Sequence, residues 1–288
     1  MTRDTFERRL FGTLRWVVIA VLTVVTIFPF YYMGLLSVRP IEAVLQDPGR
    51  LWLPLSEITT ATYTAVLRSV DDGGHGFLVF LRNSFLVAIA TVFLTLLVSI
   101  PGSYAVSRLR FFGRRQVHFL FLAVYLFPSI LLAIPLFVLF TRMGLRGSLF
   151  GLTVVYIAQT LPISIYMLRS YLATIPDTIE EAATMDGCSR LTTLRKVIMP
   201  LAAPAIAANG LYIFTIAWNE FLFALLFLVE KRDQWTVSLG LAQLSGGVEV
   251  PKTILMAGSV VLTIPVVLMF FIAERALTEG LTAGADKG

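Results

Sequence analysis

The chain has 288 residues, of which 57% are hydrophobic and only 14% are Asp, Glu, Lys or Arg. Because an average soluble domain carries roughly a quarter of its residues as charged side chains, this composition excludes a soluble cytosolic enzyme and predicts an integral membrane protein. The net charge of +5 then reflects sorting of basic residues across a bilayer and not a nucleic-acid site, while one Cys and two separated His residues predict neither a disulfide framework nor a metal centre.

Six apolar stretches are long enough to cross a bilayer, which takes about 20 residues per helix. The predicted spans are residues 16–36, 85–106, 117–140, 149–168, 198–229 and 254–273. Four arginines precede the first stretch, as in a signal peptide. Its apolar run is nevertheless longer than a signal core of about 7–15 residues, and no small-x-small cleavage pattern follows. We expect it to remain as an uncleaved helix.

The basic residues predict the orientation, because cytoplasmic segments are enriched in Lys and Arg. With the N-terminus inside, 14 of the 23 Lys and Arg residues lie in inner segments. The segment 107–116 decides the matter, since it has four Arg and no acidic residue. Both ends are therefore predicted to be cytoplasmic.

Prolines occur inside several of these spans. Pro128 and Pro135 are seven residues apart, on nearly the same face of the third span, and both can bend it. Pro162 and Pro265 can break the fourth and sixth spans in the same way.

The long inner loop after the fourth span predicts two short helices. Pro176 followed by acidic residues is typical of a helix start, and Ile179, Ala182 and Ala183 share one small apolar face. Gly187 allows a sharp break after this helix.

The second helix is predicted to begin at Ser189, whose side chain can cap its first turn. Leu191, Leu194 and Ile198 are expected on one side of it.

This loop resembles the EAA motif of permease subunits of type I ATP-binding-cassette (ABC) importers. The matching features are Glu181–Ala183, Gly187 and the hydrophobic-x-hydrophobic-Pro ending at Pro200. Val197 and Met199 depart from the commonest residues of the motif but keep its apolar character. The alternative is an ordinary surface helix with a solvated acidic end.

Other segments resemble the carbohydrate branch of that family, specifically the maltose-permease G-like subunit. They are Arg82–Ser84, Tyr104–Phe111, Phe127–Ser129, Ile134–Leu136, Gly144–Leu145, Ala217–Phe221 and the tail Gly280–Gly288. The resemblance implies an all-α membrane protein with six transmembrane helices and the type I importer permease fold. It divides the chain into a cytoplasmic segment 1–15, a first helix 16–36, an outer loop 37–76, a transport domain 77–273 with a coupling loop 169–199, and a cytoplasmic tail 274–288.

In that family the motif forms a coupling helix, which sits in a cleft of the cytoplasmic ATPase. The resemblance therefore implies that Glu181 is the main contact to the ATPase. The residues expected to couple to the ATPase are Glu180, Glu181, Ala182, Ala183, Asp186 and Gly187.

The fifth span carries a polar stripe that can contribute to a transport path. Asn209, Tyr212, Asn219 and Glu220 recur at helical spacing, and an ionised Glu facing lipid would cost about 2.5–3.5 kcal/mol. Glu220 is therefore expected to face the bundle, a partner subunit or water. These residues either bind sugar hydroxyls or hold the helices together, and we favour structural or gate-forming roles. With Trp218, expected mainly to pack, they are the residues predicted to form the translocation path or gate.

The sequence has no G-x-x-x-x-G-K-[ST] phosphate loop, no zinc-protease motif and no spacing for nucleophilic catalysis. We therefore predict no catalytic residue, no metal and no cofactor in this chain, with ATP and Mg²⁺ bound by a partner ATPase. The expected function is import of an oligosaccharide or disaccharide across the bacterial cytoplasmic membrane. The expected partners are an ATPase dimer, a second homologous permease, an extracytoplasmic substrate-binding protein and the lipid bilayer.

Two alternatives remain open for the function. The same machinery could import glycerol phosphate, a polyol or another solute. A secondary transporter driven by ions through Glu220 would belong to a different class, and it would have no need of an EAA-like loop.

Overall fold

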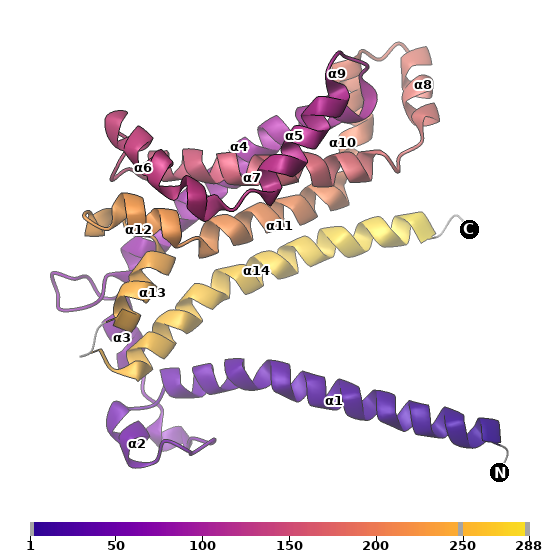
Figure 1. Ribbon diagram of the computed structural model, residues 1–288. Helices are drawn as coiled ribbons and strands as arrows, with labels where there is room; N and C mark the ends of the chain where they lie inside the picture. The colour runs from indigo at the N-terminus through magenta and orange to yellow at the C-terminus, as the bar shows by residue number, and fades with distance from the viewer. Residues whose placement is uncertain (1–2, 247–249, 286–288) are drawn as a thin grey trace. The chain divides into compact units, whose positions relative to one another are not determined.

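In the computed structural model, which describes residues 3–246 and 250–285, all regular elements of the described chain are helices (Figure 1). The chain divides into two compact units. The first contains Met1–Phe77 and Gln243–Val261, and the second contains Leu78–Ala242 and Leu262–Gly288. Three helices contribute to both units, namely α4 (Phe77–Arg108), α13 (Val237–Gly246) and α14 (Lys252–Ala285).

The first unit begins with α1 (Arg3–Ser37) and continues through α2 (Ile41–Gln46), η1 (Leu55–Glu57) and α3 (Ala61–Leu67). The segment after α1 is folded on itself around a buried arginine. Arg39 is 1% exposed, and its Nη2 donates to the carbonyls of Ala43 and Asp47, each at 2.7 Å. This guanidinium therefore stabilises a compact arrangement in what the sequence predicts as an outer loop.

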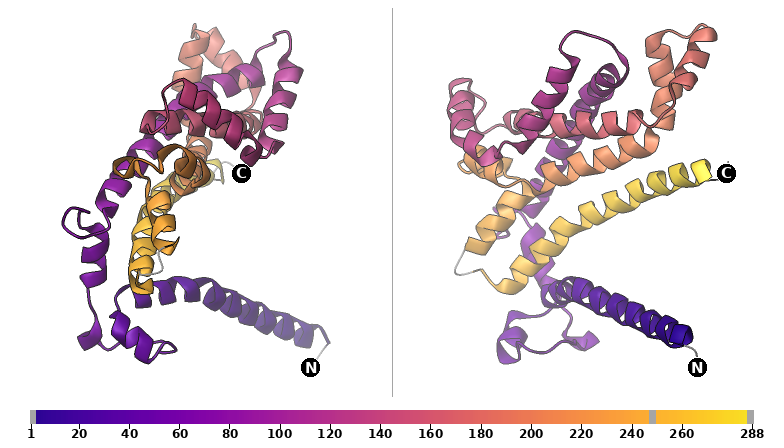
Figure 2. Two further views of the ribbon diagram at one scale, coloured as in Figure 1. Left: turned by 60° about the vertical axis from the view of Figure 1, so that its left-hand side comes forward. Right: turned by 45° about the vertical axis from the view of Figure 1, so that its right-hand side comes forward.

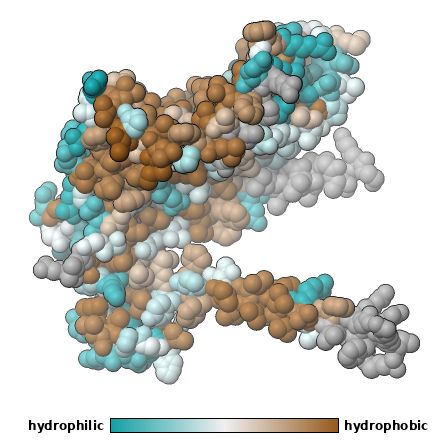
Figure 3. Space-filling view, viewed as in Figure 1, coloured by the Kyte–Doolittle hydropathy of each residue, from teal (hydrophilic) through white to brown (hydrophobic). Residues whose placement is uncertain are grey.

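The second unit is a helical bundle with two helices, α7 and α11, lying side by side (Figures 1 and 2). Besides α4, α13 and α14, its elements are α5 (Arg114–Leu126), η2 (Ser129–Leu132), α6 (Ala133–Arg142), α7 (Leu149–Leu172), α8 (Asp177–Met185), α9 (Arg190–Thr193), the π-helical turn η3 (Leu194–Ile198), α10 (Met199–Leu201), α11 (Ala203–Asn219), α12 (Leu222–Leu228) and η4 (Arg232–Gln234). Apolar residues cover the middle of this bundle, and polar residues gather toward its ends (Figure 3).

A row of small hydroxyl side chains lies buried along α4. Thr91, Thr95, Ser99 and Ser103 recur every four residues, and each is 0% exposed. Thr95 Oγ1 lies 3.1 Å from Thr160 Oγ1 of α7, so the two helices are joined by a hydrogen bond between hydroxyls. Small residues at a helix interface let the backbones approach closely, as is common in membrane bundles.

Four single helices of the described residues are long and apolar enough to cross a membrane. They are Phe11–Ser37, Phe77–Arg108, Leu149–Leu172 and Lys252–Arg275. A fifth is obtained when the bent pair Arg190–Leu201 and Ala203–Asn219 counts as one span. The predicted number of six is reached only if α5 and α6, each short on its own, together form one broken span.

The prolines act differently from one span to the next. The predicted third span is not a continuous helix, because α5 ends at Leu126 and both Phe127 and Pro128 are extended. Proline removes a backbone donor and disfavours helical geometry at the residue before it. The possible breaks at Pro162 and Pro265 do not occur, since both residues lie inside the unbroken helices α7 and α14.

The predicted fifth span, 198–229, is interrupted twice. The first interruption is a bend of 79° between the Arg190–Leu201 and Ala203–Asn219 segments. The second is at Glu220, which is extended (φ −64°, ψ 131°) and separates α11 from α12. The carboxylate of Glu220 therefore lies at a break between two helices, whereas the sequence alone predicts it on the polar stripe of one continuous helix.

Candidate functional site

The helix α8 lies apart from the long helices, between the end of α7 and the short helix α9 (Figure 1). Pro176 precedes it in an extended conformation, and Asp177 and Glu180 occupy its first turn. Carboxylates there face the positive end of the helix dipole, which is favourable. Residue type and position thus explain where the helix begins.

Gly187 ends α8, as the sequence predicts. Its φ is +78°, a left-handed conformation that costs non-glycine residues about 1–2 kcal/mol. Its N–H donates to the Thr184 carbonyl, and the Cys188 N–H donates to the Ala183 carbonyl, both at 3.0 Å. This is the Schellman arrangement, which satisfies the last carbonyls of a helix.

The second short helix has its predicted cap but not its predicted face. The Thr192 N–H donates to Ser189 Oγ at 3.4 Å. Leu194 and Ile198 are buried in a cluster with Tyr104, whereas Leu191 is 75% exposed. Leu191 therefore does not share the buried side of Leu194 and Ile198.

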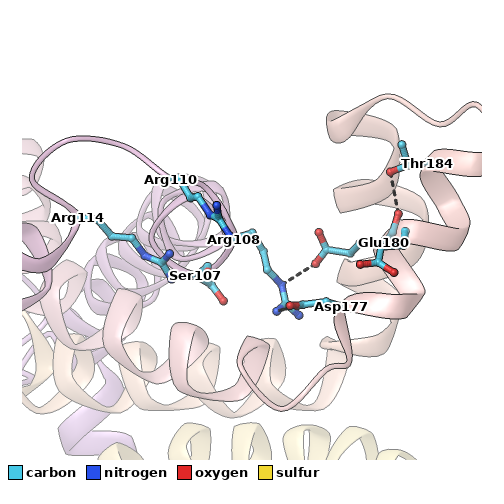
Figure 4. A pocket seen from close by; sticks show the side chains of 8 residues that line it. Ser107, Arg108, Arg110, Arg114, Asp177, Glu180 and Thr184 are labelled. Carbon is cyan, nitrogen blue, oxygen red and sulfur yellow. Dashed lines mark hydrogen bonds and ion pairs between the residues drawn. The ribbon is translucent and has the colours of Figure 1, made fainter.

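Arg108, the last residue of α4, joins three segments of the chain (Figure 4). Its Nε donates to Glu180 Oε1 at 2.7 Å, and its Nη1 donates to Asp177 Oδ1. Its Nη2 donates to the Leu172 carbonyl at 3.0 Å and to the Ile175 carbonyl at 2.6 Å. One guanidinium therefore binds the start of α8, the last residue of α7 and the linker between them.

The Arg108–Glu180 pair is the protected part of this network. The side chains of Arg108 and Glu180 are 14% and 17% exposed, whereas that of Asp177 is 75% exposed. Tyr104, one helical turn before Arg108, donates its hydroxyl to the second oxygen of Glu180 at 2.9 Å. Both oxygens of Glu180 are thus bound by residues of α4.

The neighbouring glutamate has a different environment. Glu181 is exposed, as are Ala182, Met185 and Asp186, while Ala183 is buried. A pocket of about 580 Å³ is lined by Ser107, Arg110 and Arg114, from the end of α4 to the start of α5, and by Glu180 and Glu181 of α8. Figure 4 shows Glu180 across this pocket from Ser107, Arg110 and Arg114. The predicted coupling residues therefore divide into two groups. Glu180 and Ala183 face the bundle, whereas Glu181, Ala182, Asp186 and Gly187 are exposed.

In the second predicted site, Glu220 acts as a helix cap. Its carboxylate accepts the Phe223 N–H at 2.9 Å and the Ala224 N–H at 3.2 Å, both at the start of α12. The Tyr156 hydroxyl of α7 donates to the same carboxylate at 2.6 Å. These contacts satisfy backbone groups that the break in the fifth span would otherwise leave unpaired.

The other residues of the predicted stripe do not form one lining. Trp218 is 1% exposed, and its Nε1 donates to the Leu262 carbonyl at 3.0 Å, so it is packed inside the bundle. Asn209 is buried, Tyr212 is half-buried, and Asn219 is exposed. The helix presents them to different surroundings, so they are not gathered into one site.

Sequence reasoning misses the residues that hold the loops onto α4. Arg108 stands out in the sequence only for its charge and as part of a family-like segment, and Asn83 and Ser84 only as part of another such segment. Asn83 Nδ2 donates to the carbonyls of Asp233 and Trp235, and Ser84 Oγ accepts the Val237 N–H at 2.8 Å. The partners are up to 153 residues apart, so no local pattern reports them.

Comparison with known proteins identifies the class. Residues 99–281 match the family "Binding-protein-dependent transport system inner membrane component". This chain belongs to that family, and it is a multi-pass membrane permease subunit.

Particular relatives cover nearly the whole chain. The inner membrane ABC transporter permease protein YcjP of Escherichia coli is 36% identical over 94% of each chain. The trehalose/maltose transport system permease protein MalG of Thermococcus litoralis is 37% identical over 93% of this chain and 94% of its own. A bacterial ABC transporter involved in the import of alginate has a chain with the same fold, with a TM-score of 0.78 at 24% identity over 96% of this chain and 98% of that one. The fold is thus that of type I importer permeases.

Proposed function

We propose that this chain is the permease subunit of an ATP-driven carbohydrate importer and that α8 is its contact to the ATPase. The observation that best supports this proposal is the exposed face of α8. Glu181 and Ala182 are exposed on a short helix that is held at both ends, by Pro176 and by the Schellman turn at Gly187. Such a helix offers a charged group and small side chains to the surface of another protein.

The remaining partners follow from the same proposal. Two ATPase subunits bind ATP and Mg²⁺, since this sequence has no phosphate-binding loop of its own. A second homologous permease completes the translocation path, and a substrate-binding protein delivers the cargo from outside. The complex resides in a bacterial cytoplasmic membrane, with both ends of this chain in the cytoplasm.

The proposed cargo is an oligosaccharide or a disaccharide. It is supported by the trehalose/maltose permease from Thermococcus litoralis, which is 37% identical. Within the fifth span, we assign the gate to the break at Glu220 and a path-lining role to Asn219, because Asn219 is the exposed polar residue beside that break. Asn209, Tyr212 and Trp218 would support this region from within the bundle.

The test is affinity purification of the tagged chain from native membranes in mild detergent, with identification of the proteins that accompany it. We expect an ATPase, a second permease and a binding protein. Glu181→Lys should remove the ATPase, whereas Glu42→Lys, an exposed position on α2, should retain it. Recovery of the chain alone, active in vesicles without ATP, would contradict the proposal.

The co-purified binding protein then identifies the cargo. Its thermal stability is measured with maltose, trehalose, alginate oligosaccharides, a polyol and glycerol phosphate, because a ligand that binds the folded state raises the melting temperature. Stabilisation by one of the saccharides is expected. Stabilisation by glycerol phosphate or the polyol alone would overturn the carbohydrate assignment while leaving the importer intact.

A further inference from the structure

We infer that Arg108 is a positioning residue, which holds α8 in a fixed orientation on α4 and α7 so that movement of α8 is passed directly to these membrane helices. This role rests on the proposed function for the origin of that movement. The geometry of the brace, defined as Tyr104, Arg108 and Glu180 with the Leu172 and Ile175 carbonyls, stands independently of it.

Apolar packing alone gives α8 little attachment to the bundle. The helix has nine residues, of which Ala183 is buried and Ile179 packs at the edge of the core cluster. Isolated helices shorter than about 12–15 residues are marginal in water. Packing of one alanine and one isoleucine is therefore a weak attachment, and polar contacts must fix the helix in place.

Arg108 supplies these polar contacts in several directions at once. Its planar guanidinium donates at the same time to Glu180, to the last carbonyl of α7 and to the Ile175 carbonyl of the linker. A planar fork with five N–H groups can satisfy several acceptors in fixed geometry, which a lysine ammonium cannot reproduce. The orientation of α8 relative to α7 is therefore set, and not merely its distance.

The brace is also protected from solvent. Arg108 and Glu180 are 14% and 17% exposed, and Tyr104 OH occupies the oxygen of Glu180 that Arg108 leaves free. Charge-assisted hydrogen bonds are stronger and shorter than neutral ones. Under the brace, Tyr104, Leu172, Ile175 and Ile198 form part of one buried apolar cluster, so its anchor points do not move independently.

The brace separates the roles of two adjacent glutamates. Glu180 holds α8 from inside, and Glu181 remains exposed for the partner. A change at Glu180 or Arg108 should thus keep the residues of the binding surface intact but let α8 change its orientation relative to α4 and α7. A change at Glu181 should weaken binding without loosening α8.

The experiment measures the α7–α8 geometry by double electron–electron resonance in the full-length chain, alone and in its purified complex. Spin labels replace Phe150 and Met185, which are 66% and 90% exposed, in a Cys188→Ser background. The 24-residue α7 is about 36 Å long, which puts the labels in a measurable range. The unchanged chain should give one narrow distance distribution, the same without nucleotide and with Mg-ATP and vanadate.

Arg108→Met should broaden that distribution, since loss of charge-assisted bonds lowers the ratio of held to released α8 by about 10- to 100-fold. Arg110→Met is the matched control, because Arg110 is an exposed arginine two residues further on; it should leave the width unchanged. Equal widths in the unchanged chain and Arg108→Met would overturn the inference.

Arg108→Lys decides the matter if Arg108→Met does not accumulate in membranes. It keeps a positive charge near Glu180 but cannot bind both carbonyls and the carboxylate together, so an intermediate width is expected. A width equal to that of the unchanged chain would overturn the inference. Because the distance is also measured without partners, absence of an ATPase from the complex would refute the proposed function and leave the brace testable.

Discussion

At the scale of single residues, a few side chains stabilise the backbone of this protein because they accept hydrogen bonds from unpaired N–H groups where helices are interrupted. Glu220 is the clearest case, because the break between α11 and α12 would otherwise leave N–H groups of α12 unpaired in a largely apolar bundle. Its carboxylate accepts two of these N–H groups and the Tyr156 hydroxyl. A residue that the sequence suggests as a path or gate residue thus has a structural role, which fits the alternative of an ion-driven secondary transporter poorly.

Replacement of Glu220 by Ala should destabilise the protein by about 2–4 kcal/mol, the sum expected from a lost helix cap and a buried unpaired donor. Glu220→Gln keeps an acceptor for α12 and should cost less. The measurement is thermal unfolding of the purified chain in detergent. Glu230→Ala is the control, since its exposed ion pair with Arg146 should contribute at most about 1 kcal/mol. Equal effects at both positions would contradict the capping role.

Gly187 gives a second test at this scale. Gly187→Ala should cost about 1–2 kcal/mol, because a Cβ meets nothing within 4 Å and the penalty is purely one of left-handed backbone geometry. Gly113 is a matched control, with φ +86° and equally open space at the start of α5. Both variants should lose similar stability, but only Gly187→Ala should reduce the amount of ATPase that co-purifies. Reduction by both would point to general misfolding.

At the scale of helices, the sequence predicts where a helix begins or ends better than whether a membrane span is one continuous helix. The α7 helix begins at Leu149, as expected, and α8 ends at Gly187 because its signals are local residues with strong conformational preferences. Continuity depends on the surroundings instead. Pro128 ends a helix, yet Pro162 lies within α7, which is packed against α11 and remains unbroken. Proline sets a local preference, and packing decides whether it prevails.

The hydroxyl contact between α4 and α7 is a test at this scale. Thr95→Val keeps the shape and removes the hydrogen bond to Thr160, so it should cost roughly 0.6 kcal/mol, the average for such bonds in membrane bundles. Thr95→Leu inserts extra volume at a position that is 0% exposed, and overpacking should cost about 1–3 kcal/mol. Thermal unfolding in detergent separates the two. A larger loss of stability for Thr95→Val than for Thr95→Leu would show that the hydrogen bond, and not the close approach of the two backbones, holds the helices together.

At the scale of the whole molecule, features set by neighbouring residues could be predicted from the sequence, whereas contacts between residues far apart along the chain could not. The all-helical class and the apolar spans follow from composition and from patterns within a few residues. The outward role of Glu181, which is exposed, follows from the family resemblance of its loop. The Arg108–Glu180 pair joins positions 72 residues apart, and the Asn83 anchor joins positions 150 and 152 apart. One sequence carries no sign of such pairings, so the support of the predicted coupling helix could not be foreseen.

Membrane topology is the prediction that tests the molecule as a whole. The distribution of Arg and Lys places the segment between α4 and α5 inside and the segment between α1 and α3 outside. Phe112 and Leu55 mark these two segments, and both are highly exposed, at 103% and 88%. In a Cys188→Ser background, Leu55→Cys should react with a membrane-impermeant maleimide in intact cells with a permeable outer layer, and Phe112→Cys should react only in inverted vesicles. Labelling of Phe112→Cys from outside would reverse the orientation, and α8 would then face away from any cytoplasmic ATPase.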